Sequence, residues 1–494
     1  MERMLAREWL LTQEVDLEIK VVNYLFNADR FVSTAELSSV LNEETKKITK
    51  IVQKLEDHVK DHGDKNIQLL RVKRGGVHLV LPSETDMKTL LSHLLLTSPL
   101  IALLDELFSN TFISVINYSQ NNYISEATVR RYIRKIRTYL GQYNIDIARR
   151  DFSIEGSEKQ IRIFMLLFYW RINQGVGWPF RNISEHRVER IVDYLCDEKK
   201  GLSKVSRIER RRMMFYIAIT LIRTREKKYI KIIRDWEMER NSYFDKFFEA
   251  FSELKKDIFL SEDEILFHYE IWKIFLWTSD MAGIIEQEQE KQSGVAISVN
   301  ATLRLFQEYF FTLNPSFIKQ IEPYLYATHM SASLFENLLT DLNGYQYLRK
   351  IELYYPELKK RISNLIDILY KTTNNKIFLE ESYLIIYYWA IFSHFNKAAM
   401  YEKKTNLLLE TDLPKSLRET LRQMVEGHFN FKYNINVYTS DMNYNENEMD
   451  IILSTNTLDG LDKEYPNAKI IAINREIRNR DLRRIERELL NNLE

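Results

Sequence analysis

Cysteine is nearly absent from this sequence, which has a single cysteine, Cys196, among its 494 residues. One thiol excludes an intramolecular disulfide and any zinc site built on two or more thiolates, and it favours a reducing compartment. Glycine and proline are also scarce, with 13 and 8 residues. So few turn-forming residues argue against a protein of many short strands. We therefore expect a mainly helical protein of the cytoplasm.

Net charge is missing as well, because 70 Lys and Arg balance 70 Asp and Glu. Together with a hydrophobic content of 45%, this balance excludes disorder as the general state of the chain. The longest apolar runs, such as residues 164–170 and 385–392, are far shorter than the roughly 18 residues of a membrane span. Acidic residues near the N-terminus argue against a secretory signal peptide. We expect a soluble protein of several domains.

The common catalytic signatures do not occur either. The sequence contains no GxGxxG, GxxxxGK[ST], HExxH or GxSxG pattern, which mark dinucleotide, nucleotide, zinc-protease and hydrolase sites. Neighbouring carboxylates such as Glu380 and Glu381 do not face one another on a helix, so they do not form a shared acid and base site. We expect no enzymatic activity, no cofactor and no metal site.

Charge is unevenly distributed along the chain although it sums to zero. Residues 126–150 hold seven Lys or Arg against two acids, and residues 44–74 hold nine against five. Residues 199–234 are also basic, whereas residues 434–464 hold seven acids and a single lysine. A basic helix is by default a solvated face, so its place in a fold decides whether it indicates nucleic-acid binding.

Residues 20–82 follow the order of a winged helix-turn-helix unit. Apolar residues spaced by three and four predict three helices up to about residue 63, and Asn42 is expected to cap the third. Residues 67–73 and 77–82 flank two glycines and predict a two-stranded hairpin. The same order recurs about 80 residues later, where Ser125 is expected to cap a strongly basic helix. Two tandem winged units are a stronger prediction than one.

The third helix of each unit carries the expected DNA contacts. Val129, Ile133 and Ile136 fall on one face of the second unit's helix, and bases occupy the rest. The guanidinium fork suits guanine edges and phosphates, although a solvated basic face remains the alternative. The candidates are Thr45, Lys46, Thr49, Lys50 and Gln53 in the first helix, Thr128, Arg130, Arg131, Arg134 and Lys135 in the second, and Arg71, Lys73, Arg74 and Arg149 in the wings.

The remainder of the chain predicts two further kinds of structure. Aromatic-rich helices alternate with charged ones from residue 160 to 400 and indicate two helical bundles, with residues 286–294 as the linker between them. In the last 95 residues, a helix precedes continuous aliphatic runs that predict a small parallel sheet and a closing helix. The predicted strands are residues 434–440, 449–455 and 468–474.

Two segments resemble a known family. Residues 123–136, YISEATVRRYIRKI, and residues 151–170 are similar to the wing and linker of the Mga-type virulence regulators of Gram-positive bacteria. An IxGxExxIR pattern shared with other regulators of the sugar phosphotransferase system is met by Ile154, Gly156, Glu158, Ile161 and Arg162. The resemblance covers the whole chain and implies a mainly α fold of two winged helix-turn-helix units, two phosphotransferase regulation domains and a small C-terminal α/β domain.

The resemblance also implies domain boundaries. The N-terminal segment and first winged unit would span residues 1–85, the second winged unit 86–160, the first regulatory bundle 161–290, the second 291–400, and a module similar to a IIB-type sugar-transport subunit 401–494. Such a transport subunit needs a nucleophilic cysteine, but Cys196 lies far upstream. Phosphotransfer by this module is therefore not expected.

The family further implies phosphorylatable histidines in the bundles. Phe215 and Tyr216 stand where a first histidine would be expected in the first bundle. For every candidate, a histidine that only packs against aromatic residues or lies on the surface is the alternative. The candidates are His329 and His394 in the second bundle, His268 in the first, and His186 outside the pattern.

The leading hypothesis is a cytoplasmic transcription regulator, by resemblance a virulence activator, that responds to phosphotransferase status. It would bind double-stranded DNA as a homodimer or higher homo-oligomer, with the phosphocarrier protein and RNA polymerase as further candidate partners. Two other hypotheses stay open, an RNA-binding antiterminator and a helical scaffold linked to the phosphotransferase system. An antiterminator would need a short N-terminal β domain, whereas residues 20–82 indicate mainly helix.

Overall fold

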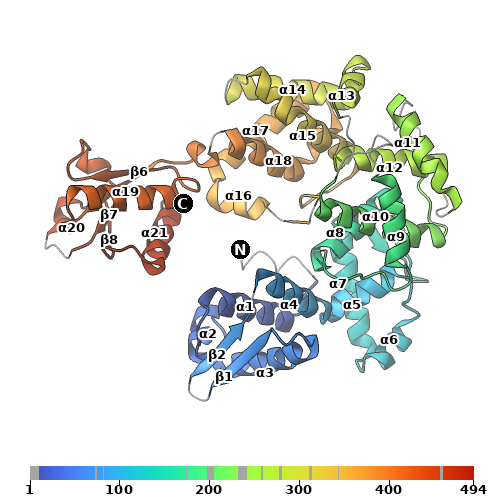
Figure 1. Ribbon diagram of the computed structural model, residues 1–494, viewed down its shortest axis with the longest axis horizontal. Coiled ribbons are helices and arrows are strands. Elements are labelled where there is room, and N and C mark those ends of the chain that lie inside the picture. Colours follow the sequence, from blue (N-terminus) through green and yellow to red (C-terminus); the bar gives the residue numbers. More distant parts are fainter. Residues whose placement is uncertain are drawn as a thin grey trace. The chain divides into compact units, whose positions relative to one another are not determined.

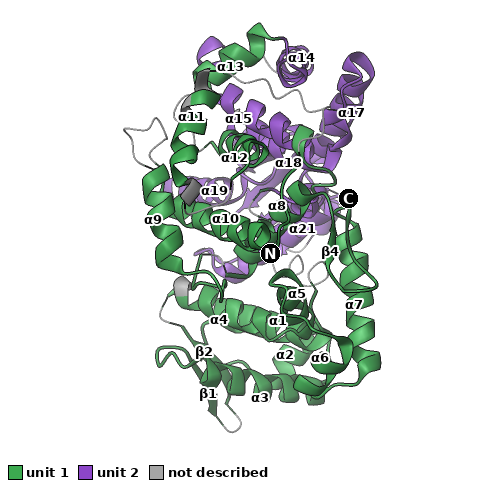
Figure 2. Cartoon of the chain, turned by 90° about the vertical axis from the view of Figure 1, so that its right-hand side faces the viewer, with its two compact units in different colours: residues 1–291, 333–338, 342–345 green, residues 292–332, 339–341, 346–494 purple. Residues whose placement is uncertain are grey.

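The computed structural model is dominated by helices, with short strands in three places (Figure 1). The chain divides into two compact units, which are coloured separately in Figure 2. The first unit holds residues 1–291, 333–338 and 342–345, and the second holds residues 292–332, 339–341 and 346–494. The structure describes residues 10–72, 75–81, 83–173, 175–196, 205–231, 242–256, 260–276, 281–310, 314–342, 344–345, 347–395, 397–456 and 460–493.

The first winged unit forms as predicted, with three helices followed by an antiparallel hairpin. Leu70 pairs with His78 in the hairpin, and Val32 adds an isolated bridge to Val77, so that a third short strand joins the wing. Its elements are α1 (Gln13–Ala28), α2 (Thr34–Leu41), α3 (Thr45–His62), β1 (Gln68–Val72) and β2 (Gly76–Val80).

The predicted capping role of Asn42 is wrong. Asn42 ends α2 in the left-handed conformation, with φ of 52°, and its backbone N–H donates to the Ser38 carbonyl. Glu44 precedes α3 and makes no side-chain capping bond. The turn between the two helices needs one left-handed residue, and asparagine adopts that conformation more readily than most residues.

The second winged unit repeats the first at a constant spacing. Ser119 lies 81 positions after Ser38 in the sequence, and the two serines make the same bond across their turns. The Ser38 hydroxyl donates to the Glu43 carbonyl at 2.6 Å, and the Ser119 hydroxyl donates to the Ile124 carbonyl at 2.7 Å. The elements are α4 (Glu84–Leu96), α5 (Pro99–Phe108), α6 (Val115–Asn121), α7 (Glu126–Gly141), β3 (Ile145–Ile147) and β4 (Ile154–Gly156).

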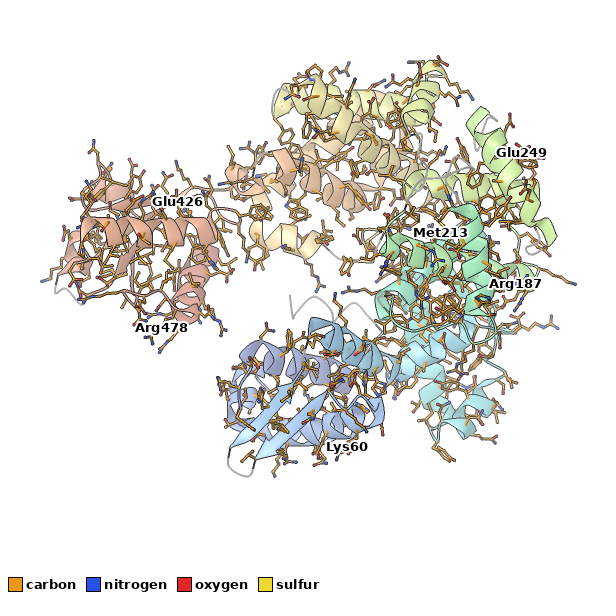
Figure 3. The ribbon with its side chains drawn as sticks, in the orientation of Figure 1. Lys60, Arg187, Met213, Glu249, Glu426 and Arg478 are labelled. Carbon is orange, nitrogen blue, oxygen red and sulfur yellow. The ribbon has the colours of Figure 1, made fainter. Side chains whose placement is uncertain are left out.

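A first helical bundle follows the second wing directly. Its interior is mainly apolar with a few buried charged residues, and Figure 3 labels one of its apolar core side chains, Met213. The linker predicted over residues 286–294 is wrong for its first half, because a helix continues to Glu290 and the next begins at Gly294. Glutamate and glutamine favour helix, which explains the extension. The helices are α8 (Glu158–Asn173), α9 (Glu185–Leu195), α10 (Arg207–Arg225), α11 (Ser242–Ser252), α12 (Glu262–Ile274) and α13 (Met281–Glu290).

The second bundle lies in the second unit. Leu358, Ile362, Leu365 and Leu369 form the buried face of its longest amphipathic helix, spaced by three and four residues as the helical period requires. Pro356 begins that helix, where proline's missing N–H costs no internal bond. The helices are α14 (Gly294–Tyr309), α15 (Pro315–Leu334), α16 (Leu348–Tyr354), α17 (Pro356–Thr373) and α18 (Glu381–Phe395).

The C-terminal module is a parallel four-stranded sheet in the order β6-β5-β7-β8, which confirms the predicted small parallel sheet. The sequence prediction missed β5, although it pairs with two neighbours. Helices α19 and α21 cover one face, and Leu461 and Tyr465 cover the other. The elements are β5 (Thr405–Glu410), α19 (Lys415–Phe429), β6 (Ile435–Thr439), β7 (Ile451–Ser454), α20 (Leu461–Glu464), β8 (Lys469–Ala472) and α21 (Asn479–Asn491).

Among the described residues, no single helix is long and apolar enough to cross a membrane. Residues 86–96 and 99–108 pass that test only as a pair, and the two segments are bent by 80°.

Candidate nucleic-acid interface and regulatory bundles

Helix α3 separates its apolar and polar residues as predicted. Ile48, Val52 and Leu55 are buried, and this places the opposite face in solvent. The Thr49 hydroxyl donates to the Thr45 carbonyl at 2.8 Å, so this side chain is partly used by its own helix. The exposed residues of that face are Thr45, Lys46, Thr49, Lys50 and Gln53.

The first wing is connected to α3 by a side-chain bond. Arg71 on β1 donates to the Gln53 side-chain oxygen at 3.0 Å, which brings a wing guanidinium beside the exposed face of α3. Lys73 and Arg74, the other candidates in this wing, lie outside the described residues.

Helix α7 presents a stronger cationic surface than α3. Val129, Ile133 and Ile136 are buried in the unit, which leaves three arginines exposed on the remaining faces. Arg130 forms an ion pair with Glu126 at 3.6 Å, and within the described residues Arg134 has no acidic partner. The exposed arginines of α7 are Arg130, Arg131 and Arg134.

Other predicted residues of the second unit have different surroundings. Lys135 is exposed, and its ammonium group donates to the Leu11 carbonyl at 3.1 Å, which links α7 to the N-terminal segment. Thr128 is half-buried, with its hydroxyl 3.0 Å from that of Ser125. Arg137 bonds Asp146 and the Ile147 carbonyl and so supports the hairpin. Arg149 is exposed at the end of β3.

One exposed residue beside α7 was not among the sequence candidates. Tyr123 lies in the turn between α6 and α7, where it adopts φ of 53° and is 96% exposed. It occupies the position 81 residues after Asn42 in the sequence. Aligning the two units by that spacing would have revealed it, because the serine bonds that close the two turns fix the register.

The family pattern around Glu158 and Arg162 corresponds to a buried ion network in the first bundle. Arg162 is fully buried and forms two bonds with Glu264, at 2.6 and 2.8 Å, and one with Glu158 at 3.0 Å. The guanidinium of Arg223 on α10 donates two further hydrogen bonds to the Glu158 carboxylate, at 2.9 and 2.7 Å. Burial is the largest single influence on the pKa of Arg162 and lowers it, but the hydrogen bonds and the negative charges of Glu264 and Glu158 together raise the guanidinium pKa above its usual value. The network joins α8, α10 and α12.

His329 lies in a neutral, saturated network of the second bundle. The Ser298 hydroxyl donates to the Val295 carbonyl at 2.7 Å, so its oxygen accepts the Nδ1–H of His329 at 2.7 Å. The Tyr388 hydroxyl then donates to Nε2 at 2.8 Å. Burial lowers the pKa of His329 to about 3, which keeps the ring uncharged. A phosphoryl group could reach this ring only if the bundle opened.

His268 is the buried histidine of the first bundle. Its Nδ1 lies 2.7 Å from the Tyr216 hydroxyl, and among the residues that the structure describes its Nε2 has no hydrogen-bond partner. Burial and then the nearby charge of Arg162 hold the pKa of His268 well below its usual value. Tyr216, which occupies the position where the family resemblance implies a histidine, is thus the hydrogen-bond partner of His268.

The two remaining histidine candidates are exposed. His394 lies on α18 and stacks on Phe317, with 5.9 Å between ring centroids. His186 lies at the start of α9, where Nδ1 is 3.8 Å from the Glu189 carboxylate. These two rings are the ones that a donor protein could reach without unfolding a bundle.

The C-terminal module has no cysteine in the loops where a parallel sheet of this topology binds ligands. Ligands of parallel sheets bind beyond the carboxyl ends of the strands where the strand order reverses. The loops that meet there begin at Thr411 and Thr455, whose hydroxyls are 2.9 Å apart, and neither loop contains cysteine. Cys196 ends α9 in the other unit, and burial raises its thiol pKa. A phosphocysteine role is therefore not supported here.

The chain carries two winged helix-turn-helix units with basic third helices, followed by helical bundles. The family model "Mga helix-turn-helix domain" matches residues 83–169, which confirms the resemblance to the Mga-type regulators. The match covers α4 through most of α8 and includes the α7 surface.

Curated relatives agree with this assignment. The chain is 22% identical to the capsule synthesis positive regulator AcpB of Bacillus anthracis over 45% of each protein. It is 19% identical to a putative trans-acting regulator of Streptococcus pneumoniae serotype 4, over 38% of this chain and 37% of that one. It is 23% identical to the anthrax toxin expression trans-acting positive regulator of Bacillus anthracis, over 35% and 36%. The aligned region thus spans less than half of each relative.

Proposed function

We propose that this protein is a cytoplasmic, non-enzymatic transcription regulator that binds double-stranded DNA through both winged units. The observation that carries the proposal is the exposed face of α7, where Arg130, Arg131 and Arg134 surround a buried apolar stripe within the matched domain. Such a face lets the helix pack inward and present guanidinium groups to a groove or to phosphates. The regulator names of the relatives support the same conclusion.

The test is a footprint on genomic fragments followed by titration of a protected duplex at several salt concentrations. Protection of a discrete duplex site and an affinity that falls steeply with salt are expected, because phosphate contacts release counterions. A matching RNA stem-loop serves as the second probe. Tighter binding to the RNA than to the duplex would contradict the proposal and favour the antiterminator.

We further propose that the C-terminal module brings two or more copies together. Leu417 and Met424 lie two turns apart on α19 and are both exposed, and Phe431 follows at 70% exposure. An apolar strip on one helix face is costly in water and is typical of an association surface. Glu426, on a neighbouring turn of α19, is labelled in Figure 3.

Light scattering tests this association. The double variant Leu417→Glu and Met424→Glu should shift the mass toward monomer, as should removal of residues 403–494. The control is Gln423→Glu, which adds charge to the same helix at another exposed position. Equal masses for the parent and the double variant would contradict self-association through α19.

We also propose that phosphotransferase status regulates the protein, and the exposure of two candidate histidines supports them as the sites. His394 and His186 are accessible, whereas His329 and His268 are enclosed. Incubation with a phosphorylated phosphocarrier protein should give an acid-labile label that disappears in His394→Ala or His186→Ala. A label that disappears only in His329→Ala would show that the second bundle opens in solution.

A further inference from the structure

Tyr123 combines two features that are unfavourable in an isolated protein. A left-handed backbone conformation brings Cβ close to the carbonyl oxygen, which large side chains tolerate poorly. An aromatic ring that is 96% exposed also leaves apolar surface in water. Within the described residues, Tyr123 makes no ring contact and no side-chain hydrogen bond. The folded chain by itself therefore gives no reason for tyrosine at this position.

The first winged unit shows what the turn itself requires. Asn42 adopts nearly the same φ, 52° against 53°, and the serine bonds that close the two turns match. Asparagine and glycine are the usual residues for this conformation. The turn geometry therefore does not need an aromatic side chain.

Tyr123 lies next to the exposed basic surface of α7. It lies two residues before Ser125, the cap of α7, so it precedes the helix that carries the three exposed arginines. Where such a helix enters a groove, the turn ahead of it faces the sugar-phosphate backbone at the groove edge. Phenol is suited to that surface, because its hydroxyl can donate to a phosphate oxygen and its ring can cover a deoxyribose.

We propose that Tyr123 is a DNA-backbone contact of the second winged unit, with its hydroxyl donating to a phosphate and its ring lying against the adjacent sugar. The inference rests on the proposed function and adds to it a residue outside the basic face. Because the contact is neutral and directed at the backbone, it strengthens binding to different duplex sequences by a similar factor and leaves the salt dependence unchanged.

The decisive variant is Tyr123→Gly in the full chain. Glycine adopts positive φ without strain, so the variant should fold at least as well as the parent, and thermal unfolding checks this. Duplex affinity should fall about tenfold, as the loss of one hydrogen bond to a charged acceptor and its ring contact implies. Tyr123→Phe, which keeps the ring, should fall about threefold. The slope of affinity against salt should match the parent in both variants.

Asn42→Gly is the matched control, because it makes the same backbone change at the equivalent turn and should leave affinity unchanged. Parental affinity in Tyr123→Gly overturns the inference. The proposed function survives that result if the α7 triple-arginine variant still loses binding, and both fail if it does not. Normal DNA binding with lost transcriptional stimulation in Tyr123→Gly would also overturn the inference, since the ring would then contact a protein.

Discussion

The two winged units share one backbone plan and differ in the chemistry of their exposed surfaces. Residues 81 positions apart in the sequence close the same turns and bury the same helix face. On the outer face, however, Thr49, Lys50 and Gln53 of α3 correspond to Arg130, Arg131 and Arg134 of α7. Because the buried pattern maintains the fold, the outer residues are free to diverge, and we infer that the second unit contributes more to DNA affinity.

The two wings differ in the extent of their β-pairing, and here the first unit has more. In the first unit, Val32 is buried and bridges Val77, so the hairpin gains a third strand. The equivalent residue of the second unit, Ile113, is 76% exposed, and its hairpin pairs only three residues on each strand. The first unit thus has the more extensive scaffold and the second the more cationic helix.

The largest expected effect comes from removing the cationic helix surface. Replacing Arg130, Arg131 and Arg134 with Ala should lower duplex affinity at least about a hundredfold, since three contacts of roughly 1 kcal/mol or more are lost. The slope of log affinity against log salt should become shallower by up to about 2.7, or about 0.9 for each phosphate contact. A gel-shift titration at four salt concentrations measures both quantities.

The matched variant replaces Thr49, Lys50 and Gln53 with Ala. It removes one charge in place of three, so the slope should change by about 0.9 and the affinity by about tenfold. Circular dichroism confirms that both triple variants fold. Equal losses in the two variants would show that the units contribute equally, which contradicts the inferred division of roles.

The next effect concerns the three-stranded wing. At Gly76, with φ of 98°, an added Cβ would lie 2.3 Å from the Val32 carbonyl oxygen. Gly76→Ala should therefore lower the free energy of unfolding by about 2 kcal/mol, through strain and loss of the bridge. Urea unfolding of the full chain, followed by hydrogen exchange of β1 and β2, measures this change.

The control lies in the second unit. Gly141 ends α7, and an added Cβ would meet nothing within 4 Å. Gly141→Ala should stabilise the chain by up to about 1 kcal/mol, because alanine favours helix. If Gly76→Ala were as well tolerated as Gly141→Ala, the bridge to Val32 would not stabilise the wing.

The smallest expected change in stability tests whether the turns of the two winged units are equivalent. Ser38→Ala and Ser119→Ala each remove one hydroxyl bond to a turn carbonyl, at 2.6 and 2.7 Å. Each should lower the free energy of unfolding by about 1 kcal/mol, and the loss at Ser38 should be slightly larger, because its hydroxyl also accepts from Thr45 at 3.2 Å. Hydrogen exchange of the amides of α3 and α7 reports on each unit separately. Clearly unequal losses would mean that the equivalence of the two turns is only geometric.

Sequence reasoning predicted what depends on local periodicity. The buried stripes of α3 and α7, the Ser125 cap and both hairpins follow from residue spacing and turn chemistry. It missed what depends on distant partners. The bond between Lys135 and the Leu11 carbonyl joins residues 124 positions apart, so residue spacing could not predict it, and the DNA contact expected for Lys135 stays a prediction. Strand β5 contains only a short leucine run, and it becomes a strand because β6 and β7 pair with it.

Tyr123 shows a different limit of the sequence approach. Nothing local distinguishes an exposed tyrosine in a turn from a solvated one. Its significance depends on φ, on exposure, and on comparison with Asn42, which require the structure. The exposure of the candidate histidines also could not be predicted from the sequence, since residue spacing does not distinguish the enclosed His329 from the accessible His394.

Helix α8 belongs to two modules at once. Phe164 and Phe168 pack on Phe108 of the second winged unit, while Trp170 packs on Phe215 of the first bundle, and thirteen of its 16 residues are buried. The matched family region ends at residue 169, inside this helix. A protein truncated at residue 169 would expose the apolar surface that the first bundle covers, and such a surface promotes aggregation. The second winged unit and the first bundle therefore depend on one shared helix for part of their cores.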